Sequence, residues 1–289
     1  MGSQDSLVIS HKIDPDSLDA LPRSCGVYIF KGQGALPLYI GKSVNIRSRV
    51  MSHLRTPEEQ RMIAQTRRVD FIETAGEIGA LLLESQMIKA QSPLFNQRLR
   101  RIRSLCSIRL ISTKEGLVPE IVSSKSVKLG ETPELYGLFS SPHAANVKLK
   151  ALAQEHLLCL SALGLEKTSQ RGCFGLQIKS CLGACVGKED RRTHDQRLHA
   201  ALMDSQVQIW PFAGPVDVVE ESNGWAQRHR VHNWCYLGTK CSKTGDNGFS
   251  QDTGTNSNNT TTNPEFDLDS YKILVKPIML GSVRVELQA

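Results

Sequence analysis

The chain has 289 residues, a formal net charge of +6 and a hydrophobic content of 40%. This length exceeds that of a usual single domain, so we expect two globular units, or one unit with an extended arm. The apolar content excludes a wholly disordered chain, and no apolar run approaches the roughly 20 residues that a membrane-spanning helix needs. The opening residues, MGSQDSLVISHKIDPDS, lack the basic and apolar segments of a secretion signal, which predicts a soluble, cytoplasmic protein.

The positive charge is concentrated near the N-terminus. Residues 1–110 contain 16 Lys and Arg against 10 Asp and Glu, whereas residues 111–289 contain 19 of each kind. The run QRLRRIRSLCSIR at 97–109 carries five arginines. Such a run is typical of a surface that binds a phosphate backbone, although a solvated basic face has the same composition.

Two strand-like segments begin the predicted ordered structure. GVYIFK at 26–31 and PLYIGK at 37–42 are separated by the glycine-containing linker GQGAL, which predicts a hairpin. VNIRSRVMSHL at 44–54 has apolar residues near helical spacing. The following residues 56–59, Thr-Pro-Glu-Glu, predict a capping box that opens a second helix.

A third strand and a long helix follow in the same half of the chain. RVDFIET at 68–74 alternates like a strand, and residues 74–77, Thr-Ala-Gly-Glu, predict another capping box. The helix that it opens, EIGALLLESQMIKAQ at 77–91, is apolar on most of its circumference. We therefore expect this helix to be central to a first domain that ends near residue 103.

The second part of the chain predicts mixed structure. IRLIS at 108–112 and LVPEIVSS at 117–124 favour a strand pair, and residues 143–165 favour one long helix. Residues 244–264 are almost wholly small and polar, which predicts a mobile loop without chemistry. Ordered structure is expected again at YKILVKPIML, residues 271–280.

One carboxylate lies in the middle of the central helix. Glu84 is surrounded by apolar residues in LLLESQMI, and an unpaired buried carboxylate would cost several kcal/mol. It should therefore have a cationic partner or a metal ion, unless it is partly exposed and pairs with a nearby lysine. Asn96 follows Pro93, where its amide could bond across an active face or cap a turn.

The stretch LYIGKSVNIRSRV at 38–50 combines phenolic and cationic groups. Tyr28 and Tyr39 lie in the two hairpin strands, where they are either core aromatics or reactive groups. A phenol with a pKa near 10 is a poor base. It becomes a plausible one if Lys42 stabilises the phenolate, or if the phenol relays a proton through water. Arg49 is suited to grip a phosphate oxygen.

These residues together resemble a known family of nucleases. The resemblance rests on GVY at 26–28, YIG at 39–41, Lys42, Asn45, Arg49, Glu84 and Asn96, which match the GIY-YIG endonuclease domain over residues 20–103. Within that superfamily the chain is most similar to the UvrC family, and closest to its short Cho homologues. The words YIGKSVNIRSRV, LLLE, PLFNQRLR, GLF and CVGKE carry this likeness. Residues 20–190 resemble both groups, and residues from 195 onward resemble Cho alone.

The resemblance implies an α+β fold and a division into regions. A small antiparallel sheet flanked by helices would form the nuclease domain at 20–103, after an N-terminal arm at 1–19. A mostly helical, cysteine-containing middle region would occupy 104–194. A smaller C-terminal α/β region would occupy 195–289 and contain the loop at 244–264.

The resemblance also implies hydrolysis of one DNA strand. Tyr39, assisted by Lys42 and Tyr28, would activate the water, and Arg49 would steady the pentacovalent phosphate. Glu84 would hold one Mg²⁺ or Mn²⁺ ion, which keeps several waters and is completed by the substrate phosphate. His53 occupies a family tyrosine or histidine position, which implies proton transfer or a phosphate contact, and Asn96 belongs to the implied catalytic set. The implied DNA contacts are Lys42, Asn45, Arg47, Arg49, Arg98, Arg100, Arg101 and Arg103.

Four of the eight cysteines form a distinct pattern. Cys159, Cys173, Cys181 and Cys185 have the spacing C-x13-C-x7-C-x3-C, which lacks the tight C-x2-C pairs of usual zinc sites. The spacing alone leaves buried thiols and a metal site open. UvrC-type proteins resemble the chain at all four positions, which implies a [4Fe-4S] cluster, with zinc or no metal as alternatives. Cys25, Cys106, Cys235 and Cys241 are predicted to be non-ligands.

The predicted function is that of an excision-repair endonuclease. By resemblance it would cut 3′ to a bulky lesion in double-stranded DNA held by UvrB, after UvrA has acted. One alternative is a structure-specific or mobile-element GIY-YIG nuclease that selects its own target, although residues 111–289 show no recognisable DNA-reading module. The other is a non-catalytic DNA-binding or assembly protein.

Overall fold

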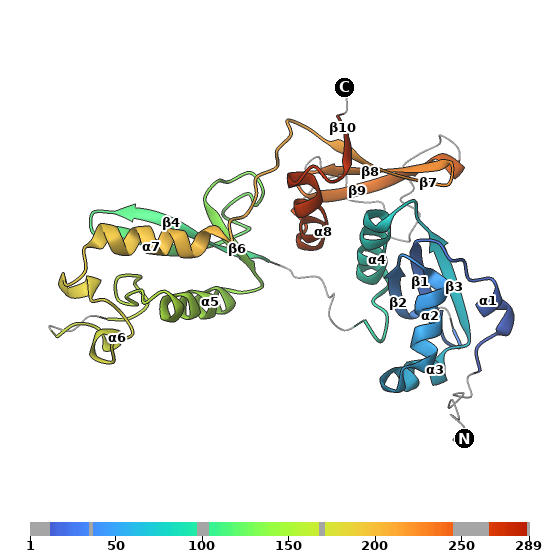
Figure 1. Ribbon diagram of the computed structural model, residues 1–289, viewed down its shortest axis with the longest axis horizontal. Helices are drawn as coiled ribbons and strands as arrows, with labels where there is room; N and C mark the ends of the chain where they lie inside the picture. The colour runs from blue at the N-terminus through green and yellow to red at the C-terminus, as the bar shows by residue number, and fades with distance from the viewer. Residues whose placement is uncertain (1–11, 35–36, 97–103, 168–170, 245–265, 288–289) are drawn as a thin grey trace, which may run out of the picture. The chain divides into compact units, whose positions relative to one another are not determined.

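The computed structural model describes residues 12–34, 37–96, 104–167, 171–244 and 266–287 (Figure 1). The chain forms two compact units, one from Met1–Arg101 with Phe212–Ala289 and one from Ile102–Pro211. None of the described helices has the length and apolar character needed to cross a membrane. The four arginines predicted at 98, 100, 101 and 103 lie outside the described residues, as does the predicted loop at 244–264 apart from Thr244.

A three-stranded antiparallel sheet forms the centre of the N-terminal part of the first unit. It contains β1 (Gly26–Lys31), β2 (Pro37–Ser43) and β3 (Arg68–Glu73) in the order β2-β1-β3, which confirms the predicted hairpin. Tyr28 and Phe30 of the middle strand face one buried cluster, while Val27 and Ile29 face another. Both faces of β1 are therefore covered, and β2 is an edge strand.

Helices cover the two faces of this sheet. The elements are α1 (Pro15–Asp19), α2 (Ile46–Arg55), the short 3-10 helix η1 (Pro57–Glu59), α3 (Gln60–Gln65) and α4 (Glu77–Gln91). Val50 of α2 packs in the cluster that contains Tyr28, and Met87 and Ile88 of α4 pack in the cluster that contains Val27. The predicted central helix at 77–91 is confirmed with the same bounds.

Both predicted capping boxes are wrong. The Thr56 side chain makes no capping bond and instead donates to the Ser52 carbonyl at 2.9 Å. The helix α4 begins at Glu77 with Gly76 as its N-cap, so Glu77 is the first helical residue and not the third. The physical reason is that each glutamate side chain has another partner: Glu59 contacts the His53 imidazole and Glu77 contacts the Lys42 ammonium.

The C-terminal part of the first unit is a four-stranded antiparallel sheet with one helix (Figure 1, orange to red). Its order is β10-β7-β8-β9, from β7 (Val216–Ser222), β8 (Trp225–His232), β9 (Cys235–Cys241) and β10 (Arg284–Leu287), with η3 (Ser242–Thr244) and α8 (Leu268–Met279). The buried Trp234 packs edge-on against Tyr271 of α8, with ring centroids 5.2 Å apart. Sequence reasoning expected an α/β region here but did not identify the individual strands.

The second unit contains another three-stranded sheet, in the order β5-β4-β6. Its elements are β4 (Cys106–Thr113), β5 (Gly116–Ser123), β6 (Leu135–Phe139), α5 (Pro142–Glu155), α6 (Phe174–Gln177), the 3-10 helix η2 (Ala184–Val186) and α7 (Arg191–Met203). The predicted strand pair is confirmed. The predicted helix at 143–165 is too long, because α5 ends at Glu155 and Leu157 adopts a left-handed φ of 52°. This break turns Leu158 and Cys159 into buried positions.

Candidate active site

Two phenols from the hairpin lie on the α2 face of the first sheet. In the register of β1 and β2, Tyr28 pairs with Gly41 and Phe30 pairs with Tyr39, so both tyrosines project from the same face. Their ring centroids are 6.2 Å apart. A Cβ atom on Gly41 would lie 2.3 Å from the Tyr28 hydroxyl and 2.8 Å from the Tyr39 ring. The glycine therefore leaves the room that the two phenols occupy.

A histidine from α2 contacts the buried phenol. His53 Nε2 lies 2.7 Å from Tyr28 Oη, and both side chains are only 1% exposed. The other ring nitrogen, Nδ1, lies 2.5 Å from Glu59 Oε2. A carboxylate accepts the proton of Nδ1, which leaves Nε2 as the acceptor for the Tyr28 hydroxyl. Glu59, His53 and Tyr28 thus form an ordered carboxylate–imidazole–phenol series.

Sequence reasoning missed Glu59 as a member of this series. It lies in the residues that predicted a capping box, in which its carboxylate would accept the backbone N–H of Thr56. The signal that remained was its position six residues after His53, just beyond the end of the helix that carries the imidazole.

Burial sets the protonation of these groups. Burial and the nearby Tyr39 raise the pKa of Tyr28, despite a hydrogen bond from Arg49. Burial and the charge of Glu84 raise the pKa of Tyr39. Burial lowers the pKa of His53, although Glu59 opposes this. At neutral pH both phenols are therefore protonated and the imidazole is neutral, which makes Nε2 the basic atom among these three side chains.

Arg49 lies at the exposed rim of the aromatic cluster. Its guanidinium forms a side-chain hydrogen bond with Tyr28, and this bond raises the pKa of Arg49. A guanidinium has five N–H donors, so several remain for a bound anion. The arrangement joins an anion-binding group directly to the buried phenol.

Glu84 approaches the cluster from the other helix. Its half-buried carboxylate accepts a hydrogen bond from the backbone N–H of Lys42, and its charge raises the pKa of Tyr39. Burial raises the pKa of Glu84, while the amide and charge of Lys42 oppose that shift. Among the described residues, no Lys, Arg or His side chain forms an ion pair with Glu84. A half-buried carboxylate of this kind fits a divalent-cation ligand.

Lys42 does not lie where the sequence suggested. Strand alternation places its side chain on the face opposite to Tyr39, and its Nζ lies 2.5 Å from Glu77 Oε1. The predicted contact between the Lys42 ammonium and the Tyr39 phenolate therefore needs correction. Lys42 contributes its backbone N–H to Glu84 and its ammonium to the first turn of α4.

Asn96 completes the edge of the first sheet. Its Oδ1 accepts from the Ile40 N–H at 2.9 Å and its Nδ2 donates to the Ile40 carbonyl at 2.8 Å. Next to it, the Phe95 N–H donates to the Leu38 carbonyl at 2.9 Å. Since β2 is an edge strand, these groups have no strand partner on that side. Asn96 therefore holds the strand that carries Tyr39.

Two predicted DNA contacts have intramolecular partners. The Asn45 side chain caps α2 by accepting the Ser48 N–H at 3.0 Å. The Arg47 guanidinium donates to the carbonyls of Leu18 and Asp19, at 3.1 Å each. These bonds anchor the start of α2 and the end of α1, so a DNA contact by either side chain stays a prediction.

The structure brings the four predicted cysteines together in the second unit. Sγ–Sγ distances are 3.7 Å for Cys159–Cys173 and 3.4 Å for Cys173–Cys181, and Cys185 Sγ accepts the Cys173 N–H at 3.4 Å. The sulfurs of Cys159, Cys173 and Cys185 all lie within 4.8 Å of one another. Among the described residues, this sulfur group contains only these four cysteines, and Cys25, Cys106, Cys235 and Cys241 lie outside it.

The donor set fits a thiophilic metal centre. Zn–S bonds of about 2.3 Å in a tetrahedron imply sulfur separations of roughly 3.8 Å, which is close to the observed spacing. A four-iron cluster is larger, so it would require the sulfurs to move apart. Burial raises the pKa of Cys181 to about 12 and that of Cys185 to about 11, so these thiols would release protons when a metal binds.

A histidine supports this cysteine group from α7. His194 Nε2 accepts the Cys159 N–H at 3.1 Å, and its Nδ1 lies 3.3 Å from Asp195 Oδ1. Burial lowers the pKa of His194, which keeps the ring neutral and able to accept. The loop that presents Cys159 is therefore tied to a helix of the same unit.

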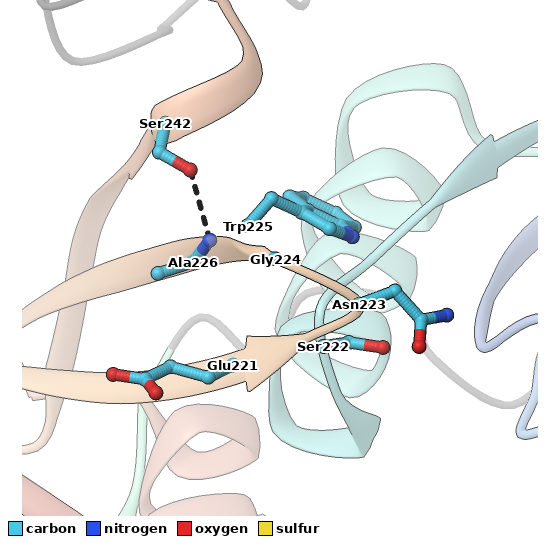
Figure 2. Close-up of a pocket in the computed structure, with 7 residues that line it drawn as sticks. All are labelled: Glu221, Ser222, Asn223, Gly224, Trp225, Ala226 and Ser242. Atoms are coloured by element: carbon cyan, nitrogen blue, oxygen red, sulfur yellow. Dashed lines mark hydrogen bonds between the residues drawn. The ribbon is translucent and has the colours of Figure 1, made fainter.

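A surface hollow at the β7–β8 turn contains none of the predicted site residues. Figure 2 shows Trp225 and Asn223 at this turn, and a bond in which the Ala226 N–H donates to Ser242 Oγ at 2.9 Å. Lys243 Nζ lies 4.1 Å from the centroid of the Trp225 ring. The hollow thus belongs to the turn between two strands, and the candidate catalytic groups lie elsewhere.

Three family models match consecutive parts of the chain. A model described as the UvrC-like GIY-YIG domain matches residues 24–97, and one described as the UvrC/Cho excinuclease middle domain matches residues 105–204. A third, described as the Excinuclease Cho C-terminal domain, matches residues 215–288.

Individual proteins are similar over most of the chain or over part of it. Excinuclease cho of Salmonella typhi is 46% identical over 270 residues, which is 93% of this chain and 87% of that protein. Excinuclease cho of Escherichia coli strain K12 is 44% identical over the same shares. The UvrABC system protein C of Ruegeria sp. strain TM1040 is 36% identical over 59% of this chain and 27% of its own length. One solved structure is also similar: the N-terminal GIY-YIG endonuclease domain of Thermotoga maritima UvrC, a point mutant bound to its catalytic divalent cation. Its sequence is 33% identical, and the match covers 29% of this chain and 93% of that chain with a TM-score of 0.27.

Proposed function

Because the chain belongs to the UvrC/Cho excinuclease family, we propose that it is a DNA endonuclease of nucleotide excision repair that cuts one strand on the 3′ side of a bulky lesion. The substrate would be damaged double-stranded DNA on which UvrA and UvrB have acted. The proposal is supported by one observation above all: five groups suited to phosphodiester hydrolysis lie together at the first sheet. They are Tyr28, Tyr39, Arg49, His53 and Glu84.

The protein's own proton acceptor would be the imidazole. As a water oxygen forms its bond to phosphorus, the bond from phosphorus to the leaving sugar oxygen would break, and that oxygen would take a proton from solvent water. The attacking water would lose a proton to Tyr39, Tyr39 would pass its own proton to Tyr28, and Tyr28 would pass its proton to His53 Nε2. The contacts in the structure follow this order, with a hydrogen bond between the two phenols and a distance of 2.7 Å from Tyr28 Oη to His53 Nε2. Glu59 then stabilises the imidazolium through Nδ1. This path avoids a free phenolate, which burial disfavours.

The remaining groups would hold the phosphate. Arg49 would donate to a non-bridging oxygen as negative charge develops on it. Glu84 would hold one Mg²⁺ or Mn²⁺ ion, which when bound supplies Lewis-acid stabilisation of the phosphate oxygens. Lys42 would act through its backbone N–H, which keeps the Glu84 carboxylate in place.

The test of function is an incision assay on a duplex with one bulky lesion and one labelled end. Purified protein is incubated with Mg²⁺, with and without UvrA and UvrB. A single cut 3′ to the lesion, formed only in the complete mixture, is the expected result. Equal cutting of undamaged DNA by the protein alone would favour a self-targeting nuclease, and DNA binding without any cut would favour a non-catalytic protein.

We propose separately that the four-cysteine segment holds a metal centre. The family resemblance favours a [4Fe-4S] cluster, whereas the sulfur separations fit a single tetrahedral ion such as zinc. Anaerobic purification followed by visible absorbance and metal analysis distinguishes them. Broad visible absorbance with about four irons per chain supports the cluster, one zinc per chain supports the tetrahedral site, and neither metal contradicts both.

We propose that the protein is cytoplasmic. We also propose four regions: an arm at 1–19, the nuclease domain at 20–103, the middle region at 104–194 and the C-terminal region at 195–289. The family matches and the two compact units support moving the last boundary toward residue 211. Limited proteolysis with mass spectrometry of the fragments checks these boundaries.

A further inference from the structure

The helix that carries Glu84 has no cap from its own sequence. Its N-cap residue is Gly76, which has no side chain to accept a bond. The nearby Thr74 hydroxyl donates to the Gly76 carbonyl at 2.8 Å and so does not accept from the helix. The first N–H groups of a helix have no partner within it, so a partly buried helix end needs acceptors from elsewhere.

Those acceptors come from the C-terminal sheet. The Glu220 carboxylate of β7 accepts the Ile78 N–H at 2.9 Å and the Gly79 N–H at 2.7 Å. Gln227 Oε1 of β8 accepts the Ala75 N–H at 2.9 Å. These side chains lie more than a hundred residues later in the chain. A carboxylate at the amino end of a helix also interacts favourably with the helix dipole.

The capping carboxylate is itself held in place. Its Oε2 lies 3.1 Å from His229 Nε2, and His229 Nδ1 lies 2.7 Å from Thr239 Oγ1. The Glu220 side chain is only 14% exposed. Burial opposes its charge, but the bonds from His229 and from the two helix amides lower the pKa of Glu220 overall. The cap is therefore ionised at neutral pH.

Two glycines allow this close approach. A Cβ atom on Gly76 would lie 2.2 Å from Glu220 Oε1, and one on Gly79 would lie 2.7 Å from the His229 ring. The φ of Gly76 is −161°, which any residue adopts, so space and not backbone conformation explains the glycine. The first turn of α4 is thus shaped to fit the C-terminal sheet.

The other end of α4 is attached to the same region. Lys89 Nζ lies 2.7 Å from Asp267 Oδ1 and 2.7 Å from Asp269 Oδ2, at the start of α8. Glu84 lies between this ion pair and the capped first turn. In that first turn Glu77 contacts the Lys42 ammonium, and the Lys42 N–H donates to Glu84.

We propose that the C-terminal sheet is a positioning element of the nuclease site, in which Glu220 and Gln227 fix the first turn of α4 and thereby place Glu84 for divalent-ion binding. Glu220, Gln227 and His229 are positioning residues, since they reach the site only through the helix. This inference rests on the proposed function in one respect: Glu84 must be the ligand of the ion.

The test compares two neighbouring carboxylates in the full-length chain. Glu220→Ala removes the cap. Glu221→Ala removes the same charge one residue later, where the side chain is 61% exposed and pairs with Arg284. Mn²⁺ binding is measured by calorimetry without DNA, and Mg²⁺ dependence is measured in the incision assay. We expect Glu220→Ala to weaken Mn²⁺ binding about tenfold, with incision partly restored at high Mg²⁺, and Glu221→Ala to change both by less than about twofold.

A Glu84→Ala chain separates the two ways of failing. If it binds Mn²⁺ and cuts like the unmodified protein, Glu84 is not the ion ligand, and the positioning role loses its premise while the endonuclease function stands. If the unmodified protein itself makes no cut in the complete incision mixture, the proposed function is wrong. If the Glu84→Ala chain loses both while Glu220→Ala keeps full ion affinity, the function stands and the positioning role is overturned.

Two further measurements distinguish a local effect of Glu220→Ala on α4 from misfolding of the whole protein. Gly79→Ala improves intrinsic helix propensity but places a methyl group against His229, so we expect weaker Mn²⁺ binding despite the better helix former. Hydrogen exchange should accelerate at least about tenfold at the Ile78 and Gly79 amides in Glu220→Ala while β1 amides stay protected. Unchanged exchange in the first turn of α4, or unchanged ion affinity in Gly79→Ala, would contradict the proposal.

Discussion

Two of the helices that flank the first sheet, α2 and α4, are held at their amino ends in different ways. Helix α2, which carries Arg49 and His53, is capped by Asn45, its own preceding residue. Helix α4, which carries Glu84, is capped by Glu220 from a sheet at the other end of the chain. Arg49 and His53, proposed for phosphate binding and proton transfer, therefore lie on a helix that its own sequence caps. Glu84, the proposed ion ligand, lies on a helix whose cap comes from a distant region. The site combines a self-contained half and a dependent half.

The largest expected effect lies on α4. We expect Glu84→Ala to reduce incision by at least about 10³-fold, because the ion's stabilisation of the phosphate is worth several kcal/mol. Binding of damaged DNA, measured by fluorescence anisotropy, should change little, since most affinity comes from phosphate contacts elsewhere. Undiminished incision by this variant would remove the metal assignment.

Two arginines on α2 offer a matched pair. Arg49→Ala should slow incision about 10²-fold at saturating DNA, because a donor to the developing phosphate charge is lost. Arg47→Ala should slow incision less than about threefold, because its guanidinium bonds to backbone carbonyls near α1. Single-turnover incision rates measure both. A larger loss for Arg47→Ala would show that the DNA contact predicted for it is the important one.

The pH dependence of the incision rate tests the self-contained half of the site, which contains His53. Burial lowers the pKa of His53 while Glu59 raises it, so removal of the carboxylate in Glu59→Gln should lower that pKa further. We expect the acid limb of the incision-rate profile to move to lower pH, and the maximal rate to fall about tenfold as the imidazolium loses its partner. A shift of the acid limb to higher pH would assign that limb to another group.

The smallest expected effects compare the two caps by stability. Asn45→Ala should lower the free energy of unfolding by about 1 kcal/mol at any pH near neutrality. The contribution of Glu220 should depend on pH, because its folded-state pKa lies below the ordinary value. That stabilisation is fully present above the ordinary glutamate pKa and is lost as the pH falls through the lowered value. Urea unfolding between pH 7 and acidic pH checks both, and a pH-independent difference between Glu220→Gln and the unmodified chain would contradict the ionised cap.

Local signals predicted much of the first sheet. Alternation and glycine-containing turns identified β1, β2 and β3, and the long apolar stretch at 77–91 identified α4 with its observed bounds. The C-terminal sheet contains a comparable signal: Asn223-Gly224 forms the two-residue turn between β7 and β8, with φ of 47° and 81°. An Asn-Gly pair between strand-like segments is among the strongest short-range hairpin signals.

The sequence by itself determined which chemical groups the nuclease domain contains and which strand or helix carries each one. It could do so because strand alternation and helix spacing depend only on neighbouring residues. Only the tertiary structure decided which groups meet. Glu59 and Glu77 looked like parts of capping boxes, yet they contact His53 and Lys42. The acceptor for the first turn of α4 comes from Glu220, 142 residues after Ile78. Such partners are chosen by the packing of distant segments, since a charged or hydrogen-bonding group takes the strongest partner that the folded chain brings within reach.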